Sequence, residues 1–362
     1  MFRKKQLWIV MIGLMLFAIL ILVDIGTKEI IYKDPPQVIA QSPHYKAEVI
    51  WPLTMKDKEI AGEASGVAIA ASGNLYYLHR GSSSYGGDKR ITEPTIIEID
   101  PQTKEVKKRW GENLFVSPHG LEIDPYGQIY VTDTILNQVF KFSPEGALLQ
   151  TFGEEYPFYL EWTLRIRNLI PHFPTGINAD TFARPTDLTV GKDESIIVSD
   201  GYRNHRIVKF DASGKRVWEV NQFGANAGQF HLPHSITQDK DGNLYVADRN
   251  NARIQVFTPD GSFRESWNQS ELGRPFAVDV GLDEHIYVAD GGDALYSEGN
   301  QEQSQIVILD RNGKFLSRFG AWGTQVGQMK IPHDIEVDHR GTIYIADLQN
   351  KRLQAFYKTE QK

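Results

Sequence analysis

Three proline–histidine pairs, at 118–119, 233–234 and 332–333, are the residues whose spacing most directly suggests chemistry. Each pair opens one copy of a repeat, and the copies between them carry another residue in the histidine position. If the repeats close into a ring, His119, His234 and His333 project from alternate units toward one axis. Three neutral imidazoles around one point, with a fourth position open, are the ligand set of a catalytic zinc ion. The spacing therefore predicts zinc at these three histidines.

The elements that must position these histidines are short strands separated by turns, and helical periodicity is almost absent after residue 60. Three further copies have Ser65, Thr186 and Phe276 in the histidine position. In five copies the second strand ends in an aspartate, namely Asp133, Asp200, Asp248, Asp290 and Asp347. The shortest spacing of these aspartates suits a four-stranded propeller blade, and a closed ring leaves no blade without a neighbour. The pattern resembles NHL repeats and predicts an all-β, six-bladed NHL-type β-propeller.

Strand direction adds polar residues to the face of the disc that holds the histidines. The first strand of each copy starts at the histidine position and the second strand returns to end at the aspartate, so both points share one face. Arg80, Arg249 and Tyr202 follow second strands and belong to that face. Either arginine can hold a substrate carboxylate through two hydrogen bonds or pair with an acidic loop residue. Tyr202 is either a packing residue or, near a cation, a base.

Other histidines and acidic residues have several readings. Asp334 directly follows a predicted zinc ligand, so it either orients an imidazole or binds a hard cation. The aspartates that end the second strands are interpreted as structural acceptors of loop N–H groups. Four histidines lack the repeat phase and are expected at the surface or in loops: His79, His172, His205 and His231.

The N-terminus predicts a membrane anchor. Arg3, Lys4 and Lys5 precede an uncharged, mostly aliphatic run at 7–23, and about 17 residues is the lower limit for a spanning helix. The basic cluster predicts a single-pass protein in the cell membrane, with a cytoplasmic N-terminus and an extracytoplasmic propeller. A cleaved signal peptide is the alternative, although no small-residue cleavage site follows the run.

The predicted organisation has three parts. Residues 1–24 form the anchor or signal segment, 25–58 a stalk and a first strand leading into the propeller, and 59–362 the propeller. The propeller carries an insertion at about 154–183, which is aromatic-rich and predicted helical around 162–168. This insertion either covers the site as a lid or shields the edge of a blade.

Composition excludes several classes. A chain with 41% hydrophobic and 23% charged residues is a packed globular protein. The net charge of -7 gives no support for a nucleic-acid partner. The chain contains no cysteine, so disulfides and thiolate metal sites are excluded and a transition metal must use histidine or carboxylate. The propeller is expected to be monomeric.

Several stretches resemble peptidyl-α-hydroxyglycine α-amidating lyases: 79–81, 199–202, 246–249 and the three proline–histidine pairs, within a similarity that runs from about Ser65 to the C-terminus. The resemblance implies a zinc-dependent lyase that cleaves a C–N bond of peptidyl-α-hydroxyglycine to give an amide and glyoxylate. Its implied site consists of zinc on His119, His234 and His333, a catalytic group of Tyr202, Arg80 and Arg249, and a structural calcium held by the backbone carbonyls of Val67 and Leu121 and the carboxylate of Asp334.

The chain departs from that family at a few positions. Animal members carry disulfides where this chain has Arg203, Tyr245 and Val256, and a methionine near the zinc where it has Ile331. No monooxygenase sequence precedes the propeller, so the peptide or small-molecule substrate is expected to be hydroxylated by another protein. Two alternatives remain open: a non-catalytic NHL propeller that binds a protein or glycan, and a different metal-dependent propeller hydrolase.

Overall fold

A computed structural model of the chain describes residues 8, 10–17, 30–33, 44–157, 159–169, 178, 180–295 and 303–359. The chain divides into two compact units, one of Met1–Ile31 with Tyr156–Ala179 and one of Tyr32–Glu155 with Asp180–Lys362. The first unit contains a helical stretch at 10–17 and helix α3 (Tyr159–Leu169). Helix α3 confirms the helix expected in the insertion, whereas its role as a lid or an edge cover stays a prediction. His172 lies outside the described residues.

The predicted membrane helix is not supported by the structure. Within the described part of the chain, no helix combines the length and the apolar character needed to cross a membrane. Apart from Trp8 and the helical stretch at 10–17, the run at 7–23 lies outside the described residues.

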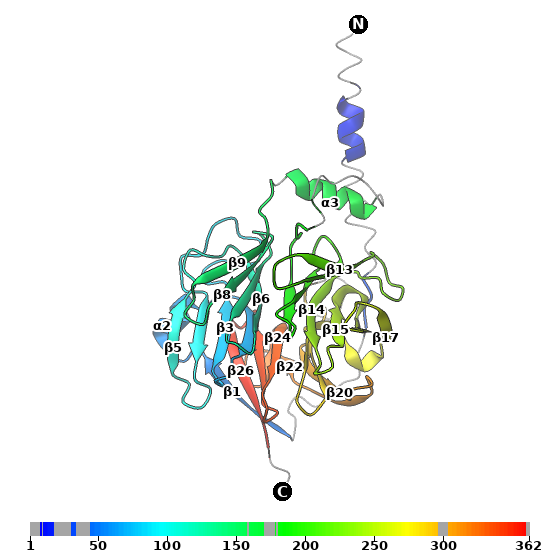
Figure 1. Ribbon diagram of the computed structural model, residues 1–362. Helices are drawn as coiled ribbons and strands as arrows, with labels where there is room; N and C mark the ends of the chain where they lie inside the picture. Colours follow the sequence, from blue (N-terminus) through cyan, green and yellow to red (C-terminus); the bar gives the residue numbers. More distant parts are fainter. Residues whose placement is uncertain are drawn as a thin grey trace. The chain divides into compact units, whose positions relative to one another are not determined.

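The second unit is a propeller of six antiparallel four-stranded sheets (Figure 1). Blade 1 consists of β2 (Ala64–Ile69), β3 (Leu75–His79), β4 (Ile96–Ile99) and β5 (Val106–Trp110). Blade 2 consists of β6 (Pro118–Ile123), β7 (Ile129–Asp133), β8 (Gln138–Phe142) and β9 (Leu148–Gly153). Blade 3 consists of β10 (Asp187–Val190), β11 (Ile196–Asp200), β12 (Arg206–Phe210) and β13 (Arg216–Asn221).

The other three blades repeat the same order from the axis outward. Blade 4 consists of β14 (Pro233–Gln238), β15 (Leu244–Asp248), β16 (Arg253–Phe257) and β17 (Phe263–Trp267). Blade 5 consists of β18 (Pro275–Val280), β19 (Ile286–Asp290), β20 (Gln305–Leu309) and β21 (Phe315–Phe319). Blade 6 consists of β24 (Pro332–Val337), β25 (Ile343–Asp347), β26 (Arg352–Lys358) and β1 (Tyr45–Trp51). The connections include α2 (Met55–Ile60), η1 (Arg249–Asn251), η2 (Ser270–Leu272) and the short parallel pair β22 (Ala321–Trp322) and β23 (Gln328–Met329).

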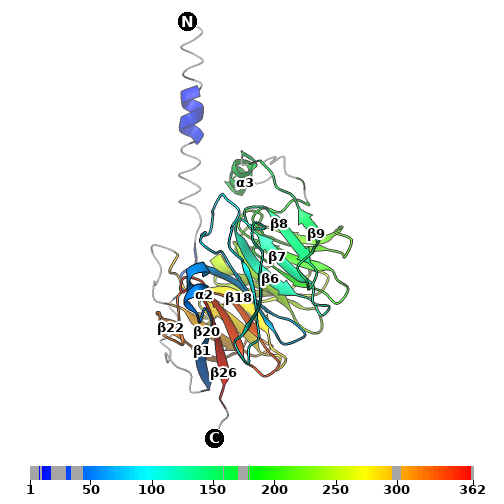
Figure 2. The same cartoon turned by 90° about the vertical axis from the view of Figure 1, so that its left-hand side faces the viewer.

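The ring closes through its two ends. Strand β1 pairs antiparallel with β26 as the outer strand of blade 6, with Tyr45 opposite Lys358 (Figure 1). The inner strands β2, β6, β10, β14, β18 and β24 each contact the next one around the axis, and β24 contacts β2. In Figure 2, β6, β7, β8 and β9 follow one another across blade 2 from the axis to the rim. The prediction of an all-β, six-bladed propeller is confirmed.

In blades 2 to 6, the aspartate that ends the second strand ties its blade together. The carboxylate of Asp133 accepts the N–H groups of Val116 and Ser117 at 2.7 and 2.9 Å and those of Ile135 and Leu136 at 2.9 and 3.0 Å. Four N–H groups on one buried carboxylate satisfy loop backbone on both sides of the strand end. The structural interpretation of these aspartates therefore holds, and each one fixes the start of an inner strand, where the predicted metal ligands lie.

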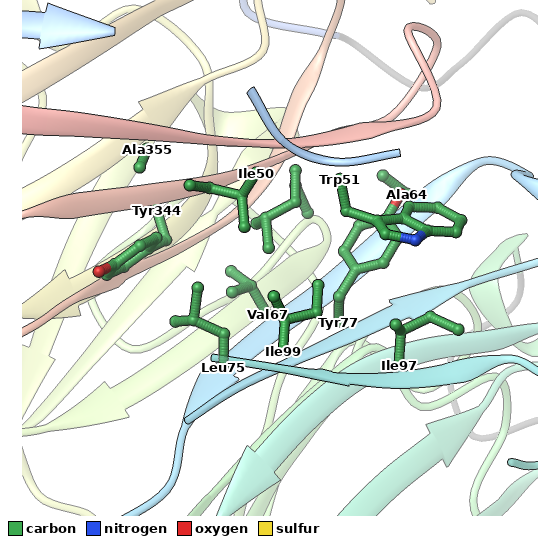
Figure 3. Close-up of a cluster of buried hydrophobic side chains, with 12 residues drawn as sticks. Ile50, Trp51, Ala64, Val67, Leu75, Tyr77, Ile97, Ile99, Tyr344 and Ala355 are labelled. Atoms are coloured by element: carbon green, nitrogen blue, oxygen red, sulfur yellow. The ribbon is translucent and has the colours of Figure 1, made fainter. Parts of the chain in front are cut away.

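Apolar side chains between blades hold the inner strands in place. At the junction of blades 1 and 6, Trp51, Val67, Tyr77 and Tyr344 pack together, each at most 1% exposed (Figure 3). Burying an apolar side chain of this size contributes roughly 1.5–3 kcal/mol. The inner strands are consequently a rigid frame for the side chains on the axis.

One part of the predicted stalk contacts the propeller. The Nζ of Lys33 donates hydrogen bonds to the carbonyl oxygens of Asn268, at 2.8 Å, and Ala252. Burial lowers the pKa of Lys33 to about 8. The guanidinium carbon of Arg274 lies 5.6 Å from the ring centre of Tyr32. Tyr32 and Lys33 are therefore docked on loops of blades 4 and 5.

Candidate active site

The three predicted ligands meet at one point of the channel. His119, His234 and His333 begin β6, β14 and β24, and one ring nitrogen from each lies within 4.8 Å of the others. Their ring centres are 4.5 to 4.9 Å apart, and the side chains are 1 to 5% exposed. The alternate-blade spacing thus brings the three imidazoles together, which is the geometric requirement for a shared ion.

The neighbouring blade orients each imidazole. The Nδ1 of His119 lies 2.7 Å from the carbonyl oxygen of Thr186. His234 makes the same contact at 2.7 Å with the carbonyl of Phe276, and His333 at 2.9 Å with that of Ser65. A carbonyl oxygen only accepts, so each Nδ1 carries the proton and donates it. The Nε2 lone pairs are then left to bind a cation.

This contact gives a reason for the alternation of histidine with other residues. Ser65, Thr186 and Phe276 occupy the histidine position in the blades that lack a histidine, and their carbonyls receive the Nδ1–H groups. Each histidine blade is thus paired with a following blade that supplies the outer acceptor of a metal-binding imidazole. A threefold arrangement of imidazoles therefore follows when histidine stands on alternate blades of a six-bladed ring.

The electrostatics keep the imidazoles neutral. Burial, as the largest cause, lowers the pKa of all three histidines well below the ordinary value of 6.5. Positive charge adds to this, from Arg249 near His234 and from Arg80 near His333. Neutral imidazole is the form that binds a transition metal, so the donor set fits a zinc-like ion.

Tyr202 reaches the same point from the loop that follows β11. Its hydroxyl oxygen lies 3.1 Å from the Nε2 of His119 and 3.4 Å from that of His234. Gly201 allows this approach, because a Cβ at that position would lie 2.0 Å from the carbonyl oxygen of Pro233. Desolvation raises the pKa of the phenol to about 12, while the charges of Arg249 and Arg80 act in the opposite direction. A cation bound by the histidines would favour the phenolate further.

Both predicted arginines lie near this tyrosine, and they differ in their contacts. Arg80 donates from Nε to the carbonyl of Pro118 at 3.2 Å and from Nη1 to Glu63 at 2.8 Å. Its Nη2 is buried and has no hydrogen-bond partner among the described residues. The guanidinium carbon of Arg249 lies 5.6 Å from the ring centre of Tyr202 and 4.8 Å from that of Phe276.

The unused Nη2 of Arg80 is informative. Leaving a buried charged donor unpaired costs about 1–3 kcal/mol or more, and an incoming carboxylate would remove that cost. The site therefore combines a cation-binding point, a phenol beside it and a buried arginine with one donor to spare.

The chain is similar in sequence to several known proteins. The NHL repeat model matches residues 182–210 and 230–257. Peptidyl-glycine alpha-amidating monooxygenase B of Xenopus laevis is 32% identical over 337 residues, which are 87% of this chain and 36% of that protein. Peptidyl-alpha-hydroxyglycine alpha-amidating lyase 1 of Drosophila melanogaster is 30% identical over 325 residues, which are 82% of this chain and 57% of the relative. This chain belongs to the amidating-lyase family of NHL propellers.

The chain therefore spans about a third to somewhat more than half of the length of these relatives. Among solved structures, a streptogramin B lyase superimposes with a TM-score of 0.58 at 15% identity, over 87% of this chain and 98% of that one. At this identity the match supports the propeller fold alone.

The calcium site that the family resemblance implies stays a prediction. The carboxylate of Asp334 accepts the N–H groups of Val67, at 2.8 Å, and Ile335, at 3.0 Å. Val67 and Leu121 lie on the inner strands of blades 1 and 2. Burial, followed by the charge of Asp187, raises the pKa of Asp334 well above its ordinary value. A cation bound there would offset the burial of the Asp334 carboxylate and its repulsion from Asp187, so this carboxylate fits the implied calcium ion.

The channel also holds acidic residues that the sequence reasoning did not single out. They are Glu122, Asp187, Asp279 and Glu336, and burial raises the pKa of each one. Three of them, all but Asp187, line a cavity of about 720 Å³ that opens at the opposite end of the channel from the histidines. In the sequence, each of these residues is the third or fifth residue of a repeat copy, counted from the proline that opens the copy.

These raised pKa values predict a pH-dependent effect of Asp279→Asn. Burial raises the pKa of Asp279 from 3.8 to about 6, so between these values the folded protein holds more protons than the unfolded chain. The stability of the wild type therefore falls as pH rises through that window. The asparagine variant does not have this loss of stability. The thermal midpoint of the variant minus that of the wild type should therefore increase from pH 4 to pH 7. Thermal unfolding of the metal-free protein measures this difference, with the exposed Asp241→Asn as control. A difference between Asp279→Asn and wild type that does not change with pH would contradict the burial argument.

The structure bears out two of the histidines expected at the surface or in loops and overturns one. His205 and His231 lie in loops, although they are only 2 and 4% exposed, whereas His79 is fully buried and lies in a strand. His79 is the last residue of β3, and its Nδ1 accepts the N–H groups of Gly62 and Gly81 at 3.3 and 3.1 Å. Its ring stacks against Trp51 and Tyr77, and burial lowers its pKa to about 3. His79 thus takes the position of the aspartate that ends the second strand in the other blades, and like Asp133 it accepts N–H groups of the loop backbone.

The structure shows where three of the residues lie at which this chain differs from the family. Tyr245 and Val256 stand directly opposite each other on β15 and β16. Ile331 is fully buried against Phe276 and Leu348 and has a φ of 62° immediately before the Pro332–His333 pair. A β-branched residue in the left-handed region is strained, and here the strain lies next to a predicted ligand.

Proposed function

We propose that this protein is a zinc-dependent lyase that cleaves the C–N bond of peptidyl-α-hydroxyglycine or a related carbinolamide, giving an amide and glyoxylate. The observation that carries the proposal is the meeting of the Tyr202 hydroxyl with His119 and His234 beside Arg80, whose Nη2 has no partner in the described structure. The named activity of the Drosophila relative supports the same reaction.

The reaction requires a group that accepts the hydroxyl proton, a site that binds the substrate carboxylate and a site that polarises the substrate hydroxyl oxygen. Zinc held by the three histidines would act as a Lewis acid on the substrate hydroxyl and lower its pKa. Tyr202, as the phenolate that a bound cation would favour, would take the hydroxyl proton at its Oη, which lies 3.1 and 3.4 Å from the Nε2 atoms of His119 and His234. Arg80, through Nη2, would bind the carboxylate, and Arg249 would place its charge beside the phenol.

The bond changes then balance without a further reactant. The C–O bond becomes a carbonyl while the C–N bond breaks and its electron pair remains on nitrogen. The proton held at the Oη of Tyr202 is available to that nitrogen, which leaves as the amide. No water is consumed, so exclusion of water by the buried histidines is consistent with elimination.

The other predictions of cofactor, location and partner are part of this proposal. A structural calcium would bind Asp334 with the carbonyls of Val67 and Leu121. The N-terminal segment would attach the chain to the cell membrane with the propeller extracytoplasmic, and the propeller would act as a monomer on a peptide C-terminus or small carbinolamide. Protease treatment of intact cells tests the location, because only an external propeller would be degraded.

Elemental analysis of the purified propeller together with a glyoxylate-release assay on α-hydroxyhippurate tests the activity. About one zinc per chain and glyoxylate release are expected. Turnover of lactones or esters without glyoxylate would favour a metal-dependent hydrolase. Absence of both metal and turnover would favour a binding module.

Arg80→Lys tests the carboxylate site. Lysine retains the charge but has a single nitrogen, so it cannot hold the Pro118 carbonyl and Glu63 and still offer a separate donor to the substrate carboxylate. We expect kcat/KM for α-hydroxyhippurate to fall roughly 100-fold, about 2.7 kcal/mol, mainly through KM. Steady-state kinetics measure this change, and Arg340→Lys, at an exposed position in a turn outside the site, is the matched control. An unchanged KM would place the carboxylate elsewhere.

A further inference from the structure

A loop of blade 1 lies directly over Tyr202. The ring centre of Tyr85, in the connection between β3 and β4, is 5.2 Å from that of Tyr202, with the planes inclined at 43°. The guanidinium carbon of Arg80 lies 5.6 Å from the centre of the Tyr85 ring. Tyr85 nevertheless remains 38% exposed. One aromatic ring therefore contacts both the predicted base and the predicted carboxylate site while keeping a free surface.

Contacts from two blades hold this ring in position. One oxygen of Glu63, Oε2, accepts the N–H of Tyr85 at 2.9 Å and the Nη1 of Arg80 at 2.8 Å. On the other side, the Nη1 of Arg184 donates to the Tyr85 hydroxyl at 3.4 Å. The carbonyl of Arg184 also accepts the N–H of Tyr202 at 3.4 Å. Glu63 thus couples the loop to Arg80, and Arg184 couples it to the loop that carries Tyr202.

The placement of the substrate follows from the proposed function. If its carboxylate binds Arg80 and its hydroxyl lies beside the Oη of Tyr202, two substituents of the carbinol carbon are fixed. The third substituent, the acylated nitrogen, must extend away from the buried histidines. The exposed surface of Tyr85 is the aromatic surface next to both fixed groups. Aromatic and apolar groups gain most from contact with such a ring.

We propose, on the basis of the proposed function, that Tyr85 is a specificity-determining residue that contacts the acyl group on the substrate nitrogen. The preferred substrates carry an aromatic or large apolar group at that position, which in a peptide is the residue preceding the α-hydroxyglycine. Glu63 is a positioning residue that aligns Arg80 and fixes the Tyr85 loop against it.

The test compares two substrates that differ only in the acyl group, N-benzoyl- and N-acetyl-α-hydroxyglycine. Tyr85→Ala should lower kcat/KM about 5- to 10-fold for the benzoyl substrate, as expected for one lost aromatic contact, and less than 2-fold for the acetyl substrate. Tyr85→Phe should keep the preference, because it retains the ring. Tyr126→Ala, an exposed tyrosine in the β6–β7 turn, should resemble the wild type.

Glu63→Gln separates positioning from contact. Glutamine still offers an oxygen to the Tyr85 N–H but removes the charge that aligns Arg80. We therefore expect KM to rise equally for both substrates while the preference for benzoyl is unchanged. Calorimetric binding of N-benzoylglycine and N-acetylglycine, which lack the reacting hydroxyl, gives a second measurement that does not depend on turnover.

The outcomes distinguish the two proposals. If the wild type releases no glyoxylate from either substrate, the proposed function is wrong. If the wild type is active but Tyr85→Ala lowers activity and binding equally for both acyl groups, the specificity role of Tyr85 is wrong and the lyase assignment remains. A loss of benzoyl preference in Glu63→Gln would overturn the separate role of that residue.

Discussion

His234→Ala is expected to abolish both metal binding and glyoxylate release. A catalytic zinc site needs three protein ligands, and the variant leaves two. Zinc content should fall from about one per chain to near zero after dialysis, and kcat/KM by at least about 1000-fold, or 4 kcal/mol. Elemental analysis and steady-state kinetics measure these changes. A wild type that contains no stoichiometric metal, together with partner binding that is unaltered in His234→Ala, would instead indicate a binding module.

The controls for this variant follow from the structure. Removing the imidazole also leaves the carbonyl of Phe276 without its donor, at a cost of about 1–3 kcal/mol. His234→Gln retains an amide donor near that carbonyl and is the second variant, with circular dichroism as the check of folding. His339→Ala, an exposed histidine outside the cluster, should keep full metal content and activity. A stoichiometric metal in folded His234→Ala would show that the ion lies elsewhere.

Tyr202→Phe should separate catalysis from metal binding. Phenylalanine keeps the ring that packs against Tyr85 and Arg249 and removes only the hydroxyl near His119 and His234. Loss of a general base costs typically 100- to 10,000-fold in rate. We expect kcat to fall within that range while zinc content stays at the level of the wild type.

The measurement is single-turnover glyoxylate release on protein of known zinc content, with Tyr126→Phe as a matched control far from the site. Equal loss of zinc and of turnover would mean that the hydroxyl supports the metal site rather than accepting the proton. Retention of most of the turnover would assign proton transfer to another group.

Much of the site was predictable because repeat phase is a local property. The histidines begin inner strands at the same position of blades 2, 4 and 6, and residues at one repeat position must share one face of a closed ring. Tyr202, Arg80 and Arg249 follow second strands, so the same reasoning placed them on the histidine face. The structure brings all six together around the axis.

The errors and omissions have a different origin. His79 does not share the repeat position of the three clustered histidines, and it is covered by Trp51 from β1, a strand that pairs with β26 from the other end of the propeller sequence. Glu63 and Tyr85 lie outside any motif, and only the fold of their loops places them on Arg80 and Tyr202. The channel carboxylates act on one another across blades that are far apart in the sequence.

The sequence by itself determined the six repeats, the alternation of three histidines and the face that each polar residue shares, because these follow from strand period and ring closure. Only the tertiary structure decided which nitrogen of each histidine is available, since the carbonyl that takes the Nδ1 proton comes from the next blade. It likewise decided what covers Tyr202, and that the Nη2 of Arg80 has no partner within the described part of the chain. Such contacts depend on how loops of different blades meet, and no local pattern of residues specifies that meeting.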